Sequence, residues 1–127
     1  MPVEVHVVTP QREVWAGPAE MVIARGVAGE VGILAGHAPL LIQLAIGPLR
    51  IQDESGQMLR AVVDGGFLHV SSDDEGTRVD VMATDAQMEA EIDFDAAARA
   101  QQELQGGEDD ASKEALARAA ARAELRG

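Results

Sequence analysis

The stretch Gly29–Ile51, GEVGILAGHAPLLIQLAIGPLRI, decides the fold class of this 127-residue chain. Short runs of Val, Ile and Leu stand on both sides of a loop that carries Gly36, His37 and Pro39. Apolar runs of this length, bounded by glycine and proline, are typical of strands. The stretch therefore predicts β-structure, and it leaves open whether the lone His37 belongs to a functional site or to a structural turn.

The strand pattern extends from Pro2 to about Ala86. The segments VEVHVVT (3–9) and TRVDVMA (77–83) alternate apolar and polar residues, as half-buried strands do. Similar short runs lie between them, and turn signals such as Ser55-Gly56 and Gly65-Gly66 separate these runs. About eight or more short strands at this spacing predict a β-sandwich or flattened barrel.

The character of the chain changes after Ala86. Residues 90–105 and 112–126 are rich in alanine and other helix formers, and the segment GGEDD (106–110) interrupts them. The pattern predicts a sandwich domain over residues 1–86 and a helical hairpin over residues 87–127. The apolar stripe expected on the first helix is thin, and it consists of Ile92, Ala96, Ala100 and Leu104. An alanine methyl contributes little on burial, so we expect the hairpin to dock weakly.

Composition excludes several classes of function. The net charge of −12 and an aromatic content of 2% argue against nucleic-acid binding, which needs a basic surface and stacking platforms. The absence of cysteine excludes disulfides and thiolate metal sites and fits a reducing compartment. Apolar runs stay well short of the roughly 20 residues of a membrane-spanning helix. The sequence therefore predicts a soluble cytoplasmic protein that meets a membrane only through other proteins.

Catalytic and metal-binding motifs are not found in the sequence. His6, His37 and His69 are isolated from one another and from metal-ligand spacings. His6 and His69 fall at strand positions, where an exposed imidazole is expected. The glycine-rich segment before His37 lacks the Lys-Ser/Thr pair of a phosphate-binding loop, and no GxSxG motif occurs. We therefore expect a non-catalytic protein.

The C-terminal segment differs in charge from the rest of the chain. Residues 89–110 contain eight acidic residues and one arginine, a net of −7, whereas residues 111–127 contain four basic and two acidic residues, a net of +2. Arg118, Arg122 and Arg126 recur at i, i+4 and i+8, on one face of a helix. Two interpretations remain open: a solvated face partly paired with Glu114, or a cationic stripe offered to an acidic partner.

The segments GEVGILAGHAPLL (29–41), GPLRI (47–51) and DGGFLHV (64–70), in this order, resemble the epsilon subunit of bacterial F-type ATP synthases. The resemblance implies a ten-stranded β-sandwich followed by a C-terminal two-helix hairpin. It also implies a non-catalytic rotor subunit, monomeric when isolated, that contacts the gamma subunit, the c-ring and the alpha/beta catalytic head. Such a subunit lies at the cytoplasmic face of the bacterial cell membrane without inserting into it.

The resemblance also implies roles for particular residues. Glu30, Gly36 and His37 match loops that face the c-ring; Glu30 is the carboxylate suited to an arginine of the ring, and His37 shapes the turn or lines the interface. The stripe of Arg118, Arg122 and Arg126 matches a helix that contacts the catalytic head and restrains ATP hydrolysis. Because the second helix is short, about 15 residues, we expect only weak inhibition.

Some relatives bind ATP through an Asp and an Arg on the first helix, and this chain departs from that pattern. In IDFDAA (92–97), Asp93 is present but Ala96 stands at the arginine position. The pair Asp95 and Arg99 is one residue further apart, which points the two side chains in different directions. No cofactor is therefore expected. The alternative to a rotor subunit is a free-standing β-sandwich binding module with a regulatory helical tail.

Overall fold

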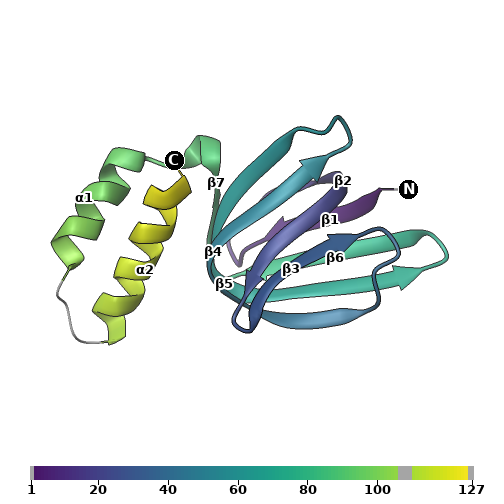
Figure 1. Ribbon diagram of the computed structural model, residues 1–127, viewed down its shortest axis with the longest axis horizontal. Coiled ribbons are helices and arrows are strands. Elements are labelled where there is room, and N and C mark those ends of the chain that lie inside the picture. Colours follow the sequence, from purple (N-terminus) through teal and green to yellow (C-terminus); the bar gives the residue numbers. More distant parts are fainter. Residues whose placement is uncertain (1, 106–109, 126–127) are drawn as a thin grey trace.

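The computed structural model describes residues 2–105 and 110–125, and over these residues seven strands precede two α-helices (Figure 1). The strands are β1 (Val3–Val8), β2 (Glu13–Gly26), β3 (Gly29–Leu34), β4 (Leu40–Asp53), β5 (Met58–Asp73), β6 (Gly76–Ala83) and β7 (Ala86–Met88). A 3-10 helix, η1 (Glu89–Glu91), leads to α1 (Phe94–Leu104) and α2 (Asp110–Leu125). The predicted fold class, a β-sandwich followed by a helical hairpin, is confirmed.

The sheet closes on itself. Its strands follow the order β1-β6-β5-β4-β2-β3, and an additional pairing joins β1 to β2. Strands β1 and β6 are parallel, and the other paired strands are antiparallel. The resemblance implied ten strands, whereas the described residues form seven, because long strands change partners along their length. The first part of β2 pairs with β1, and its second part pairs with β3 and β4.

The core of the sandwich is aliphatic. Val3, Val5 and Val7 of β1 are fully buried, while Glu4 between them is exposed, so the predicted alternation is confirmed. Strand β6 repeats the pattern with buried Val79 and Val81. Each large aliphatic side chain buried in this way stabilises the fold by about 1.5–3 kcal/mol relative to an exposed one. The buried residues of the core are therefore all aliphatic, and Trp15 packs against them half-buried.

Strand β5 bends at Gly65 and Gly66, whose φ angles are 85° and 119°. Both values lie in the region that side-chain-bearing residues rarely adopt. A Cβ atom at position 66 would collide with the backbone of Met82 and lie 2.8 Å from the Cα atom of Ala83. The bend thus requires glycine, and it sets the direction of the preceding residue, Asp64, whose amide donates a hydrogen bond to the carbonyl of Asp85 (2.8 Å).

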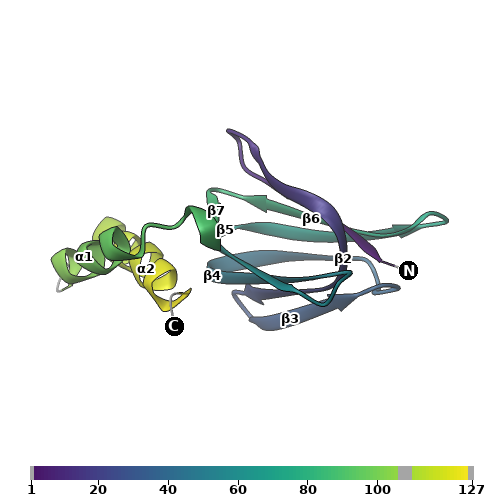
Figure 2. The ribbon, with the colours of Figure 1, turned by 90° about the horizontal axis from the view of Figure 1, so that it is seen from above.

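The helical hairpin lies at one end of the sandwich (Figures 1 and 2). Asp93 caps α1 by accepting a hydrogen bond from the amide of Ala96 (2.9 Å). Of the predicted stripe, Ile92 is buried just before α1 begins, while Ala96, Ala100 and Leu104 are half-buried and Ala97 is the buried residue of α1. Within the described residues, the helices are too short and too polar to cross a membrane.

The hairpin touches the sandwich through a small apolar cluster. Its buried members are Val62, Ile92, Ala121 and Leu125, and Ile46 and Phe94 pack against them half-buried. The main core of the sandwich contains 18 buried residues, so the second cluster is minor by comparison. The expectation of a thin docking face agrees with this arrangement.

Candidate functional site: interaction surfaces

Glu30 lies at the start of β3, next to the turn that follows β2. Its side chain is 57% exposed, and its Oε1 accepts a hydrogen bond from Nη2 of Arg50 (2.5 Å). Exposed ion pairs contribute about 0–1 kcal/mol, so Arg50 holds Glu30 only loosely. A hollow of about 240 Å³ beside it is lined mostly by the apolar turn, including exposed Val27. The carboxylate can therefore exchange Arg50 for a cation on a partner.

The loop after β3 is fastened to the β5–β6 hairpin. Gly36, with a φ of 84°, donates its amide hydrogen to Oγ1 of Thr77 (2.8 Å), and Oγ of Ser72 donates to the carbonyl of His37 (3.3 Å). The ring of His37 forms a hydrogen bond with the carbonyl of Ala38 (2.7 Å). The imidazole is thus engaged within its own turn, as a turn-shaping residue would be.

The structure does not bring Glu30 together with Gly36 and His37. Strand β3 separates them, and the part from Glu30 to Leu34 alone spans about 13 Å. In Figure 1 the loop after β3 lies at the end of the sandwich away from the helices, beside the β5–β6 hairpin. The residues implied by the resemblance therefore lie at two separate places on the sandwich.

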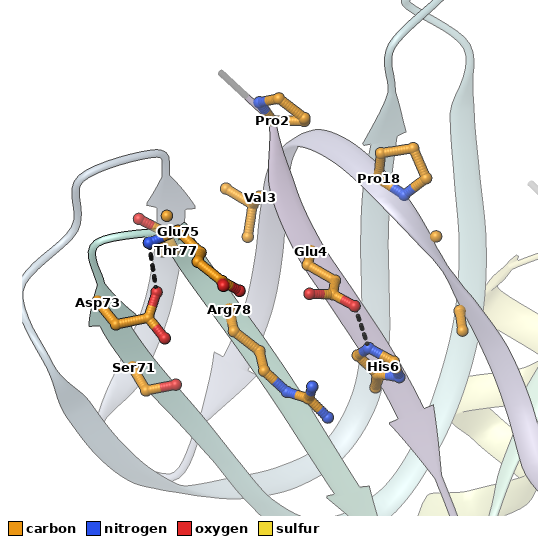
Figure 3. Close-up of a pocket in the computed structure, with 13 residues that line it drawn as sticks. Pro2, Val3, Glu4, His6, Pro18, Ser71, Asp73, Glu75, Thr77 and Arg78 are labelled. Carbon is orange, nitrogen blue, oxygen red and sulfur yellow. Dashed lines mark hydrogen bonds and ion pairs between the residues drawn. The ribbon is translucent and has the colours of Figure 1, made fainter.

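A surface pocket of about 550 Å³ opens beside the same hairpin (Figure 3). Its polar groups are engaged with one another: Nε2 of His6 lies 3.0 Å from Glu4, and Asp73 accepts the amide hydrogen of Glu75 (2.8 Å). No cluster of three or more metal-ligating side chains occurs among the described residues. His6 is half-exposed and His69 exposed, as expected of strand histidines. The pocket carries no convergent catalytic set.

Three large apolar side chains gather on the outer face of the sandwich, and we call Leu41, Phe67 and Met82 the apolar patch. They are 62%, 48% and 43% exposed. Phe67 pairs directly with Met82 across β5 and β6, and Leu41 lies diagonally opposite Phe67 across β4 and β5. Contiguous exposed apolar surface of this kind marks an interaction site. The sequence alone does not identify these three strands as neighbours, because it does not show the register between them.

The arginines of α2 face the sandwich. Arg122 donates Nη1 and Nη2 to the two carboxylate oxygens of Asp64 (2.8 and 3.1 Å) and Nε to Oε1 of Gln87 (2.5 Å). Arg118 lies 3.6 Å from Asp64 and also 3.5 Å from Glu114, the pair expected of a solvated face. Arg126 lies outside the described residues. Asp64 was not predicted as a site residue. The one feature of the sequence that could have indicated it is the position of an acidic residue within the apolar run AVVDGGFL (61–68).

The residues of the degraded ATP motif have other roles or positions. The carboxylate of Asp93 caps α1, and Arg99 is exposed on the same helix. Ala96, at the position where relatives carry arginine, supplies only its amide to the cap. The chain thus lacks the arginine of the ATP-binding pattern, and the acid that remains, Asp93, serves as the cap of α1.

Two ion pairs fix the linker between the sandwich and the hairpin. Arg12 of the β1–β2 turn reaches Glu91 (2.9 Å), and Arg60 of β5 donates two hydrogen bonds to Glu89 (2.5 and 2.9 Å). The hydrogen bond from Arg12, followed by one from the amide of Met88, lowers the pKa of Glu91 below its usual value. The linker therefore contacts the sandwich through these two ion pairs, and α1 begins beyond it.

Comparison with known proteins agrees with this geometry. The family described as ATP synthase, Delta/Epsilon chain, beta-sandwich domain matches residues 2–89. The ATP synthase epsilon chain of Thermobifida fusca is 44% identical over 118 residues, covering 91% of this chain and 81% of that one. The epsilon chain of Brevibacillus brevis is 42% identical over 98 residues, covering 77% and 71%.

Solved structures show the same fold. A chain in the cryo-EM structure of the Euglena gracilis mitochondrial ATP synthase (OSCP/F1/c-ring) has a TM-score of 0.81 at 28% identity, covering 98% of this chain and 81% of that one. A chain of the Tetrahymena thermophila central stalk and c-ring structure is similar in fold, with a TM-score of 0.60 over 98% of this chain and 93% of that one. The chain therefore belongs to the family of ATP synthase delta/epsilon subunits.

Proposed function

We propose that this chain is a non-catalytic rotor subunit of an F-type, proton-translocating ATP synthase, coupling the c-ring to the gamma subunit and the catalytic head. The observation that carries the proposal is the family match over the whole sandwich, residues 2–89. Epsilon chains at 42–44% identity and a similar chain in an F1/c-ring assembly support it. The subunit acts peripherally, at the cytoplasmic face of the bacterial cell membrane.

The closed sheet suits a part that transmits torque. Because β1 pairs with both β6 and β2, the ring of hydrogen-bonded strands is continuous, and shear must break backbone hydrogen bonds. The aliphatic core resists deformation because protein interiors are close-packed. A force applied at one surface of the sandwich is therefore transmitted to another surface with little deformation of the domain.

The apolar patch is the surface offered to the gamma subunit. Its three side chains expose large apolar area on three adjacent strands, and its burial against an apolar surface of gamma would remove that area from water. Glu30 and the Gly36–His37 loop are the surfaces offered to the c-ring, as two separate contacts. Glu30 meets an arginine of the ring by exchanging its exposed partner Arg50.

The arginine stripe of α2 restrains ATP hydrolysis only weakly. In the described conformation Arg118 and Arg122 contact Asp64 of the sandwich, so their guanidinium groups are not presented to the catalytic head. Inhibition requires the hairpin to leave this position first.

The test is a tagged pull-down from gently solubilised membranes of the host, with every co-purifying chain identified. The unmodified chain should recover gamma, the ring subunit and the catalytic head, whereas the double variant Phe67→Ser/Met82→Ser should lose gamma. Met58→Ser is the matched control, since Met58 is 41% exposed but lies outside the apolar patch. Recovery of the chain alone, from membranes with an intact synthase, would favour the free-standing module instead. Unchanged recovery with the double variant would reject the apolar patch as the gamma contact.

A further inference from the structure

Asp64 is a charged group in an unusual position. Its side chain is 5% exposed, and it follows the fully buried Val62 and Val63 in the middle of β5. Asp64 pairs with Ile46 of β4, and the two residues after it, Gly65 and Gly66, have positive φ angles. Burial of an ionised carboxylate is costly unless a partner compensates its charge.

The compensating charges come from the hairpin. Among the described residues, the recorded ion pairs of Asp64 are with Arg118 and Arg122 of α2, and the sandwich itself supplies none. Arg122 is 14% exposed and engages both carboxylate oxygens, the two-point geometry that makes an arginine–carboxylate pair strong. Gln87 accepts a further hydrogen bond from its Nε and orients the guanidinium group.

The remainder of the contact between hairpin and sandwich is small. The apolar cluster beneath α2 includes only Ala121 and Leu125 from that helix. Ala121 contributes one methyl group and Leu125 one large side chain, so the apolar contact of α2 in this cluster is limited to two buried residues. The charged contact at Asp64 is therefore a second, directional contact between hairpin and sandwich.

We propose that Asp64 is the receptor of a latch: it binds Arg122, and secondarily Arg118, and thereby keeps the hairpin on the sandwich. While the two-point contact exists, both terminal nitrogens of Arg122 are occupied, so the same group cannot serve an acidic surface of a partner. This inference rests on the proposed function. Asp64 and the catalytic head compete for the same two arginines, Arg118 and Arg122. The docked hairpin therefore withholds these arginines from the catalytic head and so opposes inhibition.

The first test uses the isolated full chain and native-state amide hydrogen exchange. Asp64→Asn should accelerate exchange of the α2 amides about tenfold or more, since a hydrogen bond to a charged partner contributes that much. Arg122→Gln should do the same, while β5 exchange stays slow and shows that the sandwich remains folded. Glu124→Gln and Arg99→Gln are the matched controls, because both side chains are exposed on the hairpin and neither is a recorded partner of Asp64, Arg118 or Arg122.

The double variant Asp64→Asn/Arg122→Gln separates a latch from two independent effects. If the two residues act through one contact, the double variant should exchange no faster than the faster single variant. Arg122→Lys, which keeps the charge but loses the two-point geometry, should fall between the unmodified chain and Arg122→Gln. Unchanged α2 exchange in Asp64→Asn, or fully additive effects in the double variant, would overturn the latch.

The second test measures ATP hydrolysis by the complete synthase assembled with each variant. Release of the latch should lower hydrolysis in Asp64→Asn, and Glu124→Gln should leave it unchanged. If α2 exchange accelerates in Asp64→Asn but hydrolysis does not change, the latch stands and the proposed contact with the catalytic head is rejected. The two measurements therefore test the latch and the inhibitory role separately.

Discussion

The sandwich and the helical hairpin are stabilised by different kinds of contact. In the sandwich, hydrogen-bonded strands close into a ring around a core of 18 buried residues. In the hairpin, alanine-rich helices meet the sandwich through four buried apolar residues and the buried pair Asp64–Arg122. Apolar burial is non-directional and tolerates small shifts, whereas a two-point ion pair exists at only one position of the helix. The sandwich is thus suited to a fixed role and the hairpin to a choice between positions.

The linker sharpens the contrast. Arg12 and Arg60 form ion pairs with Glu91 and Glu89, so η1 contacts the sandwich just before α1 begins. A hairpin that leaves its position keeps β7 paired with β5. Any change in the position of the helices should therefore leave intact the surfaces proposed for gamma and the ring, because these lie on the sandwich.

The largest effect should come from breaking the bend of β5. Gly66→Ala forces a side chain into a left-handed conformation and against the backbone of Met82, so the free energy of unfolding should fall by at least about 3 kcal/mol. Gly32→Ala is the matched control, because nothing lies within 4 Å of its added Cβ, and its effect should stay below about 1 kcal/mol. Denaturant unfolding measures both. An equal loss in the free energy of unfolding for the two substitutions would show that a side chain at position 66 causes no particular strain.

The next largest effect compares the two cores. Leu68 is fully buried in the sandwich, and Leu68→Ala should lower the free energy of unfolding by about 2–5 kcal/mol. Leu104 is half-buried on α1, and Leu104→Ala should cost less than about 1 kcal/mol. Chemical denaturation, followed by circular dichroism at wavelengths that separate strand from helix, measures the two variants. A Leu104→Ala effect as large as that of Leu68→Ala would contradict the weak docking of the hairpin.

The sequence predicts most of the sandwich because local patterns carry the information. Alternation in β1 identifies Val3, Val5 and Val7 as core, and the glycine pair marks the bend of β5. The hairpin is harder. Alanine occurs both in cores and on surfaces, so the alanine-rich residues 95–104 do not show which face of the helix is buried. The predicted stripe therefore missed the burial of Ala97.

The interaction surfaces depend on contacts that no local pattern contains. The apolar patch joins residues on three strands, and the register that brings Leu41 near Phe67 is set by the whole sheet. Asp64 and Arg122 are 58 positions apart, and they meet only because the hairpin folds back onto the bend. The spacing of Arg118 and Arg122 predicts a shared helical face, but not the surface which that face contacts.

A smaller effect should follow from removing the hairpin at the right place. A chain ending at Glu91 keeps β7 and both linker ion pairs, so it should fold, assemble with gamma and the ring, and raise ATP hydrolysis by the complex only modestly. A chain ending at Asp85 loses β7 and should be less stable by about 1–3 kcal/mol, through the orphaned backbone groups of β5.

Thermal unfolding and pull-down with gamma measure these truncations. If the chain ending at Glu91 does not assemble, the hairpin has a structural role in the rotor and the division between the two regions is wrong. If both truncated chains are equally stable, β7 and the linker contribute nothing to the sandwich.

The smallest effect tests the linker through pH. The pKa of Glu91 is lowered from 4.5 in the folded protein, so its ionised form stabilises the fold above that pH, and the contribution is lost as the pH falls through the folded value. Glu91→Gln should therefore be less stable than the unmodified chain near neutral pH, and the difference should shrink below about pH 4.5. Glu124→Gln, an exposed control on α2, should show no such convergence. Thermal unfolding across this pH range decides the matter, and a difference that widened on acidification would mean that Glu91 does not anchor the linker through its charge.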